Sequence, residues 1–279
     1  MTLFPARGPE PVFRDGLFNG EVVLVSGGGS GLGRAIAVQF AALGASVAIC
    51  GRRIERLEET AELIRKNGGT VSTHAMSIRD PEAVVQLVID VANKHGRIDH
   101  LVNNAGGQFP QAAIDFSIKG WNAVIDTNLN GSWYMMQAVA RHWRDQHAQG
   151  TITNIVAVIV RGMPGVAHTC AARAGVIHLS KTLATEWAPL GIRINCVAPG
   201  AIATGGMEVY SEEARRELPR SNLMQRFGSA QDVADAVTYL AAPSGRFITG
   251  EVLTVDGGNQ LWGDQWTIPR PDYFGGPVG

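Results

Sequence analysis

Short apolar runs alternate with longer amphipathic stretches along most of the chain. Seven runs are predicted to be strands, at residues 21–27, 46–50, 70–76, 100–104, 151–160, 192–200 and 251–258. They are apolar on both faces, as the strands of a covered parallel sheet must be. Helices are predicted between them, at 31–43, 52–67, 81–95, 117–145, 168–189 and 230–242. This alternation predicts an α/β fold: a single doubly wound, seven-stranded parallel sheet of the Rossmann type, with helices on both faces.

Three stretches stand outside this alternation. Residues 1–18 are predicted to be an N-terminal extension, and residues 19–258 the Rossmann-type domain. Inside that domain, residues 203–229 are polar and mixed, and we expect this lid segment to close over a bound molecule. Residues 259–279 form a tail that we expect to pack on the protein or on a neighbouring subunit. Its aromatic residues are Trp262, Trp266, Tyr273 and Phe274.

Composition narrows the possible partners. The chain has 279 residues, 45% of them hydrophobic, and a formal net charge of −1, which gives no support for a nucleic-acid or anionic-membrane partner. Its 3 cysteines include no CxxC pair, so neither a disulfide framework nor a metal site is indicated. The first residues lack the apolar core of a signal peptide, and no apolar run approaches the about 18 residues of a membrane helix. We expect a soluble, cytoplasmic protein.

The first predicted strand ends in SGGGSGLGR, a glycine-rich turn that leads into a helix. Glycines let backbone amides approach a pyrophosphate, and the helix N-terminus adds positive potential. A tight strand–helix turn without a ligand is the alternative, and the spacing Gly-x-x-x-Gly-x-Gly differs from the commonest dinucleotide fingerprint. The candidate contacts are Gly27, Ser30, Gly31, Leu32 and Gly33.

Two arginines follow the second predicted strand and bear on the choice of coenzyme. An NAD enzyme usually places a carboxylate at this point, where it binds the ribose 2′-hydroxyl. Here Gly51 takes that place, and Arg52 and Arg53 follow it. Guanidinium groups suit a 2′-phosphate, whereas cations are otherwise disfavoured at a helix N-terminus. We therefore predict NADP(H) rather than NAD(H); a solvated helix start is the alternative.

Several motifs occur in a recognisable order: SGGGSGLG at 26–33, NNAG at 103–106, Asn128 within NLNG, APGAIAT at 198–204 and VDGG at 255–258. Together they resemble the short-chain dehydrogenase/reductase family over nearly all of 19–258. Within that family, the stretches LVNNAGGQF, KGWNAVIDTNLNG and 168–200 look most like the peroxisomal-type trans-2-enoyl-CoA reductases, with the 2,4-dienoyl-CoA reductases next.

The resemblance implies an acyl-CoA substrate and a homotetramer built through the helices at 117–145 and 168–189. It also implies further contacts to the coenzyme. These are Asn104, Ala105, Gly106, Arg173, Pro199, Gly200, Ile202 and Thr204.

The chain departs from the family at the residues that carry its usual chemistry. Most members have Tyr-x-x-x-Lys where this chain has Thr169 and Arg173, and a serine where it has Val156 or Ala157; only Asn128 matches. A threonine hydroxyl is a poor acid and an arginine keeps its proton, so ketone reduction is disfavoured. Reduction of an enoyl thioester instead requires hydrogen-bond donors for an enolate oxygen. The enoyl-CoA reductases that the chain resembles also have a small hydroxyl residue and an arginine here, beside a histidine that matches His168.

The predicted catalytic residues are thus Asn128, His168, Thr169 and Arg173, and each has a structural alternative. Thr169 would cap a helix, His168 would be a structural hydrogen-bonding group, Arg173 a surface cation, and Asn128 would fix a helix bend.

Two functions compete with enoyl-CoA reduction: a carbonyl or 3-hydroxyacyl oxidoreductase of the same family, and a non-catalytic NADP(H)-binding sensor or scaffold.

In the lid segment, Arg215, Arg216 and Arg220 are placed either to meet CoA phosphates or to form a solvated face balanced by glutamates.

Overall fold

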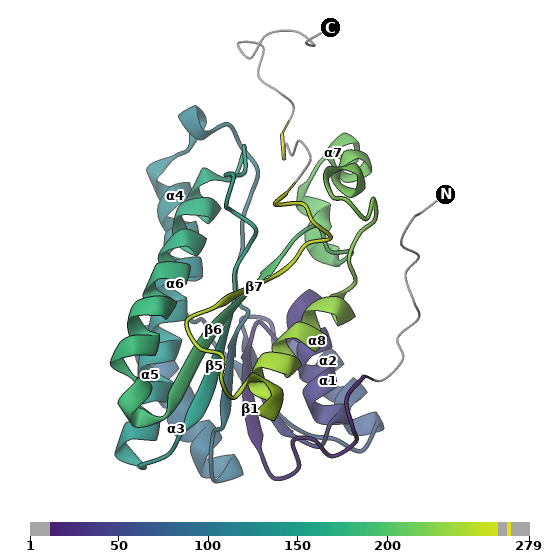
Figure 1. Cartoon of the computed structure of the whole chain (residues 1–279). Coiled ribbons are helices and arrows are strands. Elements are labelled where there is room, and N and C mark those ends of the chain that lie inside the picture. Colours follow the sequence, from purple (N-terminus) through teal and green to yellow (C-terminus); the bar gives the residue numbers. More distant parts are fainter. Residues whose placement is uncertain (1–11, 262–266, 269–279) are drawn as a thin grey trace, which may run out of the picture.

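The seven predicted strands form one parallel sheet. The computed structural model describes residues 12–261 and 267–268. The strands are β1 (Val22–Ser26), β2 (Ser46–Gly51), β3 (Thr70–Ala75), β4 (His100–Asn103), β5 (Gly150–Ile155), β6 (Ile192–Pro199) and β7 (Val252–Val255). Their order in the sheet is β3-β2-β1-β4-β5-β6-β7. Figure 1 labels β1, β5, β6 and β7 of this sheet and the helices around it. The order reverses between β1 and β4, which is where open parallel sheets of this kind bind their ligands. The predicted fold class is confirmed.

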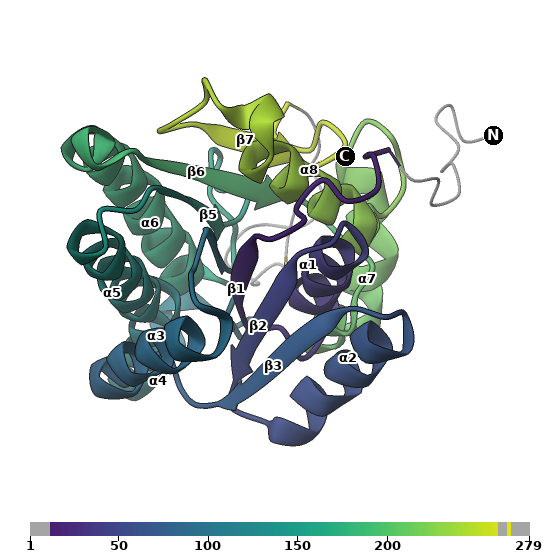
Figure 2. The same cartoon turned by 90° about the horizontal axis from the view of Figure 1, so that it is seen from below.

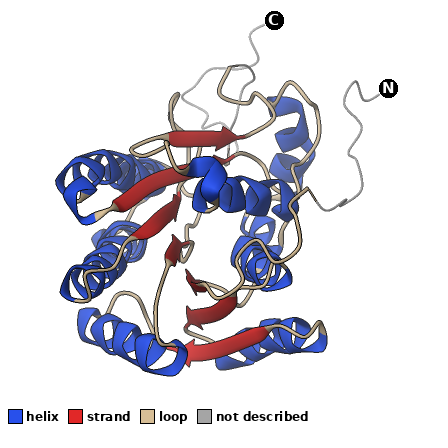
Figure 3. Ribbon diagram, turned by 60° about the horizontal axis from the view of Figure 1, so that its bottom comes forward, coloured by secondary structure: helices blue, strands red, loops and turns tan. Residues whose placement is uncertain are grey.

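Helices cover both faces of the sheet. One layer contains α1 (Gly31–Ala42), α2 (Ile54–Lys66) and α8 (Ala230–Ala241), and the other contains α3 (Pro81–His95), α5 (Gly131–Asp145) and α6 (Ala167–Glu186). Seen from below, the sheet runs between the two layers, as Figures 2 and 3 show. Side chains from both faces of β1 and β2 are fully buried, because each face packs on a helix layer.

Local signals in the sequence set the ends of α3. The Asp80 side chain accepts hydrogen bonds from the backbone amides of Glu82 (3.0 Å) and Ala83 (3.1 Å), and Pro81 occupies the first turn. Gly96 ends the helix in the left-handed conformation, with φ of 81°. The predicted range, 81–95, matches the helix.

The fifth strand is shorter than its apolar run. The sequence predicts a strand over 151–160, but β5 ends at Ile155. Val156 still donates its backbone N–H to Val197 of β6 (2.8 Å). Val156 and Val158 pack in an apolar cluster with Val176 of α6 and with Cys196 and Ala198 of β6. The run stays apolar beyond the strand because these residues pack between α6 and β6 and also line the cavity.

The predicted helix at 117–145 contains an irregular turn. It consists of α4 (Ile118–Ile125), a π-helical turn at Asp126–Asn130, and α5. A Cβ added at Gly131 would lie only 2.7 Å from the Ile78 side chain. The start of α5 therefore packs closely against the loop that follows β3. A π-helical turn reorients side chains locally, and here it carries Asn128.

The ends of the described chain also pack on the domain. Phe18 is 1% exposed and its ring lies 4.8 Å from that of Phe40, so the packed part of the chain begins before residue 19. Thr267 is buried, and its hydroxyl donates to the Pro164 carbonyl. The four aromatic residues of the predicted tail lie outside the described residues.

None of the helices in the described ranges has the length and apolar character needed to cross a membrane.

Candidate active site

A cavity of about 590 Å³ opens at the carboxyl edge of the sheet. It is lined by the loops after β1, β2, β4, β5 and β6 and by part of the lid segment. Most of the predicted coenzyme contacts line it: Gly27, Ser30, Gly31, Leu32, Arg52, Arg53, Asn104, Ala105, Gly106, Arg173, Pro199, Gly200, Ile202 and Thr204. The sequence motifs therefore meet at one place, although they are spread over most of the domain.

Gly33 does not line the cavity but shapes the loop that does. A Cβ at Gly33 would lie 2.2 Å from the carbonyl oxygen of Gly27, so no other residue fits. Gly27 itself has φ of 68°, the left-handed region that favours glycine. Gly33 is thus a close-packing residue, consistent with the third glycine of dinucleotide-binding loops.

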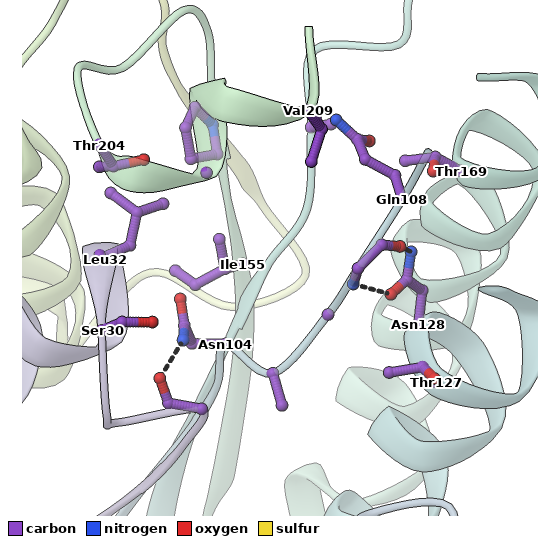
Figure 4. Close-up of a pocket in the computed structure, with 18 of the residues that line it drawn as sticks. Ser30, Leu32, Asn104, Gln108, Thr127, Asn128, Ile155, Thr169, Thr204 and Val209 are labelled. Atoms are coloured by element: carbon purple, nitrogen blue, oxygen red, sulfur yellow. Dashed lines mark hydrogen bonds between the residues drawn. The ribbon is translucent and has the colours of Figure 1, made fainter. Parts of the chain in front are cut away.

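Hydrogen bonds join the glycine-rich loop to the loop after β4. The Ser26 hydroxyl accepts from the backbone amides of Asn104 (3.1 Å) and Ala105 (3.0 Å). In return, the Asn104 side chain donates to the carbonyl oxygens of Ser26 (3.0 Å) and Gly27 (3.2 Å). Figure 4 shows Asn104 beside Ser30 in this part of the cavity. Ser30, the N-cap of α1, makes no side-chain cap bond, so the first-turn amides of α1 are available to a ligand.

The end of the cavity near β2 is positively charged. Arg52 and Arg53 are exposed, line the cavity, and have no ion-pair partner among the described residues. Arg56 and Arg79 also line it, and they pair with Glu59 and Asp126. Of the described residues that line the cavity, none is an aspartate or a glutamate. Such a lining suits a phosphorylated ligand.

Thr169 and Arg173 lie together on the cavity side of α6. Thr169 is 3% exposed and Arg173 is 7% exposed, and both line the cavity. The alternative that Thr169 caps the helix does not hold, because Val166 is the N-cap and Thr169 lies inside the first turn.

Arg173 is a buried cation rather than a surface one. Its Nη1 atom has no hydrogen-bond partner among the described residues. The guanidinium fits because residue 106 is glycine: a Cβ there would lie 2.2 Å from Nη2. Burial lowers the pKa of Arg173 to about 10, which still leaves a cation at neutral pH. A buried donor without a partner is costly, and a ligand oxygen in the cavity would satisfy it.

His168 lies behind Thr169 and does not line the cavity. Its ring is stacked on Phe116 at a centroid distance of 4.4 Å and meets the edge of Phe109 at 4.6 Å. Its Nδ1 accepts the backbone N–H of Thr169 (2.7 Å) and lies 3.3 Å from the Thr169 hydroxyl. Burial lowers the pKa of His168, which favours the neutral ring. This geometry suits a residue that orients Thr169.

Asn128 is 1% exposed and is tied to the loop after β4. Its side chain donates to the carbonyl oxygen of Gly107 (2.9 Å) and accepts the amide of the same residue (2.9 Å) (Figure 4). The π-helical turn therefore holds this loop in place, and Asn128 also contributes to the cavity wall.

The cavity wall also contains many apolar side chains. They include Val156, Ala157, Val158, Met163, Met207, Val209 and Leu218. Val156 and Ala157 lie where most members of the resembled family have a serine, so the wall has no hydroxyl at that point. This surface suits a hydrocarbon chain.

Sequence reasoning missed two polar residues of this region, Gln108 and Tyr210. Both line the cavity, and the Gln108 side chain donates a hydrogen bond to the Tyr210 hydroxyl. Gln108 could have been noticed, because it follows the NNAG motif at the carboxyl end of a strand. Tyr210 lies in the lid segment, where no periodic pattern indicates which side chains point inward.

The lid segment contains two short helical turns and one helix. These are Gly205–Val209, α7 (Glu212–Glu217) and Leu218–Ser221. Arg215, Arg216 and Arg220 are exposed and are absent from the cavity lining. Arg216 pairs with Glu212 (2.5 Å) and Arg220 with Glu217 (2.9 Å), as the alternative of a solvated, balanced face predicts.

A family model described as Enoyl-(Acyl carrier protein) reductase matches residues 27–260. A probable 2,4-dienoyl-CoA reductase of Bacillus subtilis (strain 168), described as (2E)-enoyl-CoA-producing, is 40% identical over 256 residues, which are 90% of this chain and 98% of that protein.

Solved structures match over a similar range. A citronellol catabolism dehydrogenase of Pseudomonas aeruginosa PAO1 is 41% identical with a TM-score of 0.81, over 89% of this chain and 98% of that one. A putative 2-deoxy-d-gluconate 3-dehydrogenase from Agrobacterium tumefaciens with bound NADP is 34% identical with a TM-score of 0.81, over 87% of this chain and 97% of that one.

Proposed function

Because the chain belongs to the short-chain dehydrogenase/reductase family, whose members use NAD(P)(H), we propose that it reduces a 2-enoyl or 2,4-dienoyl thioester of CoA with NADPH. The similarity to a probable 2,4-dienoyl-CoA reductase supports a conjugated thioester as the substrate. The apolar side chains in the cavity wall support an acyl chain as the part of the substrate that the cavity encloses.

The observation that carries the proposal is the pair of donors on α6. Arg173 offers a buried positive charge with an unpartnered Nη1, and Thr169 offers a hydroxyl one helical turn away. When hydride reaches the β-carbon of a 2-enoyl thioester, or the δ-carbon of a 2,4-dienoyl thioester, negative charge gathers on the thioester oxygen. A fixed cation and a preorganised hydroxyl stabilise that charge. Neither group has to give up a proton.

The residues of the cavity fit the proposed coenzyme. The glycine-rich loop and the first turn of α1 would hold the pyrophosphate, and Arg52 and Arg53 the 2′-phosphate. Arg173 would also hold the ribose hydroxyls, as the family resemblance implies. When bound, NADPH supplies the hydride. Asn128 shapes the site through Gly107, and His168 orients Thr169.

A direct assay tests the proposal against its rivals. NADPH oxidation is followed with crotonyl-CoA, with a 2,4-dienoyl-CoA and with a 3-ketoacyl-CoA. We expect turnover with at least one of the first two and little with the third. Turnover confined to the 3-ketoacyl-CoA would establish a carbonyl reductase instead. NADPH binding without turnover of any thioester would favour a sensor or scaffold.

A further inference from the structure

Gln108 and Tyr210 form a hydrogen bond between two walls of the cavity. Gln108 lies in the loop after β4, and Tyr210 lies in the lid segment, 102 positions further along the chain. Both line the cavity that contains Thr169 and Arg173. Figure 4 shows Gln108 on the Thr169 side of this cavity, next to Val209 of the lid segment.

The hydrogen bond leaves the phenol proton of Tyr210 unused. The Gln108 amide has only N–H groups at its nitrogen, so it donates and the phenol oxygen accepts. Among the described residues, no acceptor receives the Tyr210 O–H. A partly buried phenol is thus held in one position with its proton available to a molecule in the cavity.

Tyr210 is protonated at neutral pH. Burial, with an added contribution from the nearby Cys170, raises the pKa of Tyr210 to about 12. Tyr210 lines the same cavity as Thr169 and Arg173, so the phenol and the proposed oxyanion donors face one space. The Gln108 N–H acts in the other direction: it stabilises the phenolate that loss of the proton would leave.

The proposed reduction needs such a proton. Addition of hydride to the thioester leaves an enolate, which must gain a proton at carbon. Thr169 is too weak an acid to supply it, and Arg173 would lose the charge that stabilises the enolate. His168 does not line the cavity. Of the described residues that line the cavity, Tyr210 is the one with a phenol.

We propose that Tyr210 protonates the α-carbon of the enolate and that Gln108 is the positioning residue that holds and activates it; this inference rests on the proposed function. The electron pair of the enolate forms the new C–H bond as the phenol O–H bond breaks, and the thioester carbonyl is restored. The phenolate accepts the Gln108 N–H until water returns a proton to it. Together with the hydride from NADPH, the substrate gains two hydrogens.

The main test replaces Tyr210 by phenylalanine, which keeps the ring and removes the hydroxyl. Both enzymes reduce a 2-enoyl-CoA with NADPH in D₂O, and NMR determines on which face of the α-carbon deuterium enters. The wild type is expected to give one configuration. Tyr210→Phe is expected to lower kcat by about 10²–10⁴ and to give a mixture, because solvent then supplies the deuteron. Tyr239→Phe, which alters an exposed tyrosine on α8, is the matched control.

Gln108→Met tests the positioning role, because it keeps the chain length and removes the amide N–H. We expect kcat to fall more than the substrate KM changes, and deuterium to enter mainly on the wild-type face, because the phenol remains. Unchanged affinity for NADPH in both variants shows that the fold is intact.

Other outcomes would overturn the inference. If Tyr210→Phe retained the wild-type kcat and a single configuration, another group would be the acid. If it raised only the KM for the thioester, with one configuration, the hydrogen bond would be a structural latch. If the wild type reduced no enoyl thioester, the proposed function would fail and this inference with it; the wild-type assay separates that result from the others.

Discussion

At the scale of single residues, the most informative position is Thr169. Its backbone amide is bound by the Nδ1 atom of His168, and its hydroxyl lies against the same nitrogen and faces the cavity. Because this hydroxyl lines the cavity, it can turn its proton toward an oxygen atom there instead of toward Nδ1. This is the arrangement expected of a donor to an oxyanion rather than of an acid.

Replacing Thr169 by valine should separate these roles, because valine keeps the shape and removes the donor. We expect kcat for the enoyl-CoA to fall about 10²–10³-fold, while the Kd for NADPH hardly changes. Thr182→Val is the control, since Thr182 is exposed on the same helix and donates only to the His178 carbonyl. Reduction at the wild-type rate would assign the oxyanion to Arg173 or to bound water.

Arg52 and Arg53 determine the coenzyme in our proposal. Replacing both by alanine should weaken NADPH binding much more than NADH binding, because only NADPH has a 2′-phosphate that would lose its donors. Isothermal titration with each coenzyme measures the two losses. Arg65→Ala, at an exposed ion pair elsewhere on α2, should affect neither. An equal loss for both coenzymes would show that the pair does not bind the phosphate.

At the scale of elements, hydrophobic patterning was sufficient for the sheet and for most helices. It failed at the end of β5, where Val156 and Val158 continue the apolar run but pack in a cluster between α6 and β6. It also gave no indication of the π-helical turn at Asp126–Asn130, because such a turn changes the helical period only locally. Element boundaries therefore depend on tertiary packing that a single sequence does not reveal.

The candidate site was predictable where it uses short motifs. The glycine-rich loop, Arg52 and Asn104 follow strand ends, and the carboxyl ends of parallel strands meet at one edge. The contact between Gln108 and Tyr210 was not predictable, because it joins residues 102 positions apart through a segment without periodic pattern. The position of His168 behind the cavity wall likewise depends on the rings of Phe109 and Phe116.

The lid segment carries a prediction about CoA. Among its three arginines, Arg215 has no ion-pair partner in the described part of the chain, whereas Arg216 and Arg220 pair with glutamates. If this face meets the CoA phosphates, Arg215→Ala should raise the KM for an acyl-CoA more than Arg216→Ala does, because the paired cation is already neutralised. Steady-state kinetics measure both variants. An unchanged KM in the triple alanine variant would remove the phosphate role.

At the scale of the whole molecule, we propose that the chain assembles into a homotetramer through the region of α4 to α6, as the family resemblance implies. Apolar residues are exposed on α4, where Ile118 is 76% exposed and Trp121 is 36% exposed. Burial of such side chains between subunits would be favourable.

Light scattering after size-exclusion chromatography measures the assembly. We expect a mass about four times that of the 29.7 kDa chain at micromolar concentration. Ile118→Glu should weaken the assembly if α4 is part of the interface. Glu62→Gln, at a residue on the opposite helix layer, is the control. A wild-type monomer at that concentration would contradict the proposal.

The lid segment touches both ends of the cavity. A Cβ added at Gly31 of the glycine-rich loop would lie 3.8 Å from the Cβ of Thr204, so Thr204 lies beside the proposed coenzyme site. Tyr210 accepts a hydrogen bond from Gln108, on the side proposed to bind the thioester. Because the lid segment would contact both bound molecules, the affinity for one of them would depend on whether the other is bound. We therefore expect NADPH and the thioester to be cooperative, each raising the affinity of the other by the same factor. At a fixed thioester concentration, the enzyme would then reach half of its maximal rate at a lower concentration of reduced coenzyme than independent binding allows.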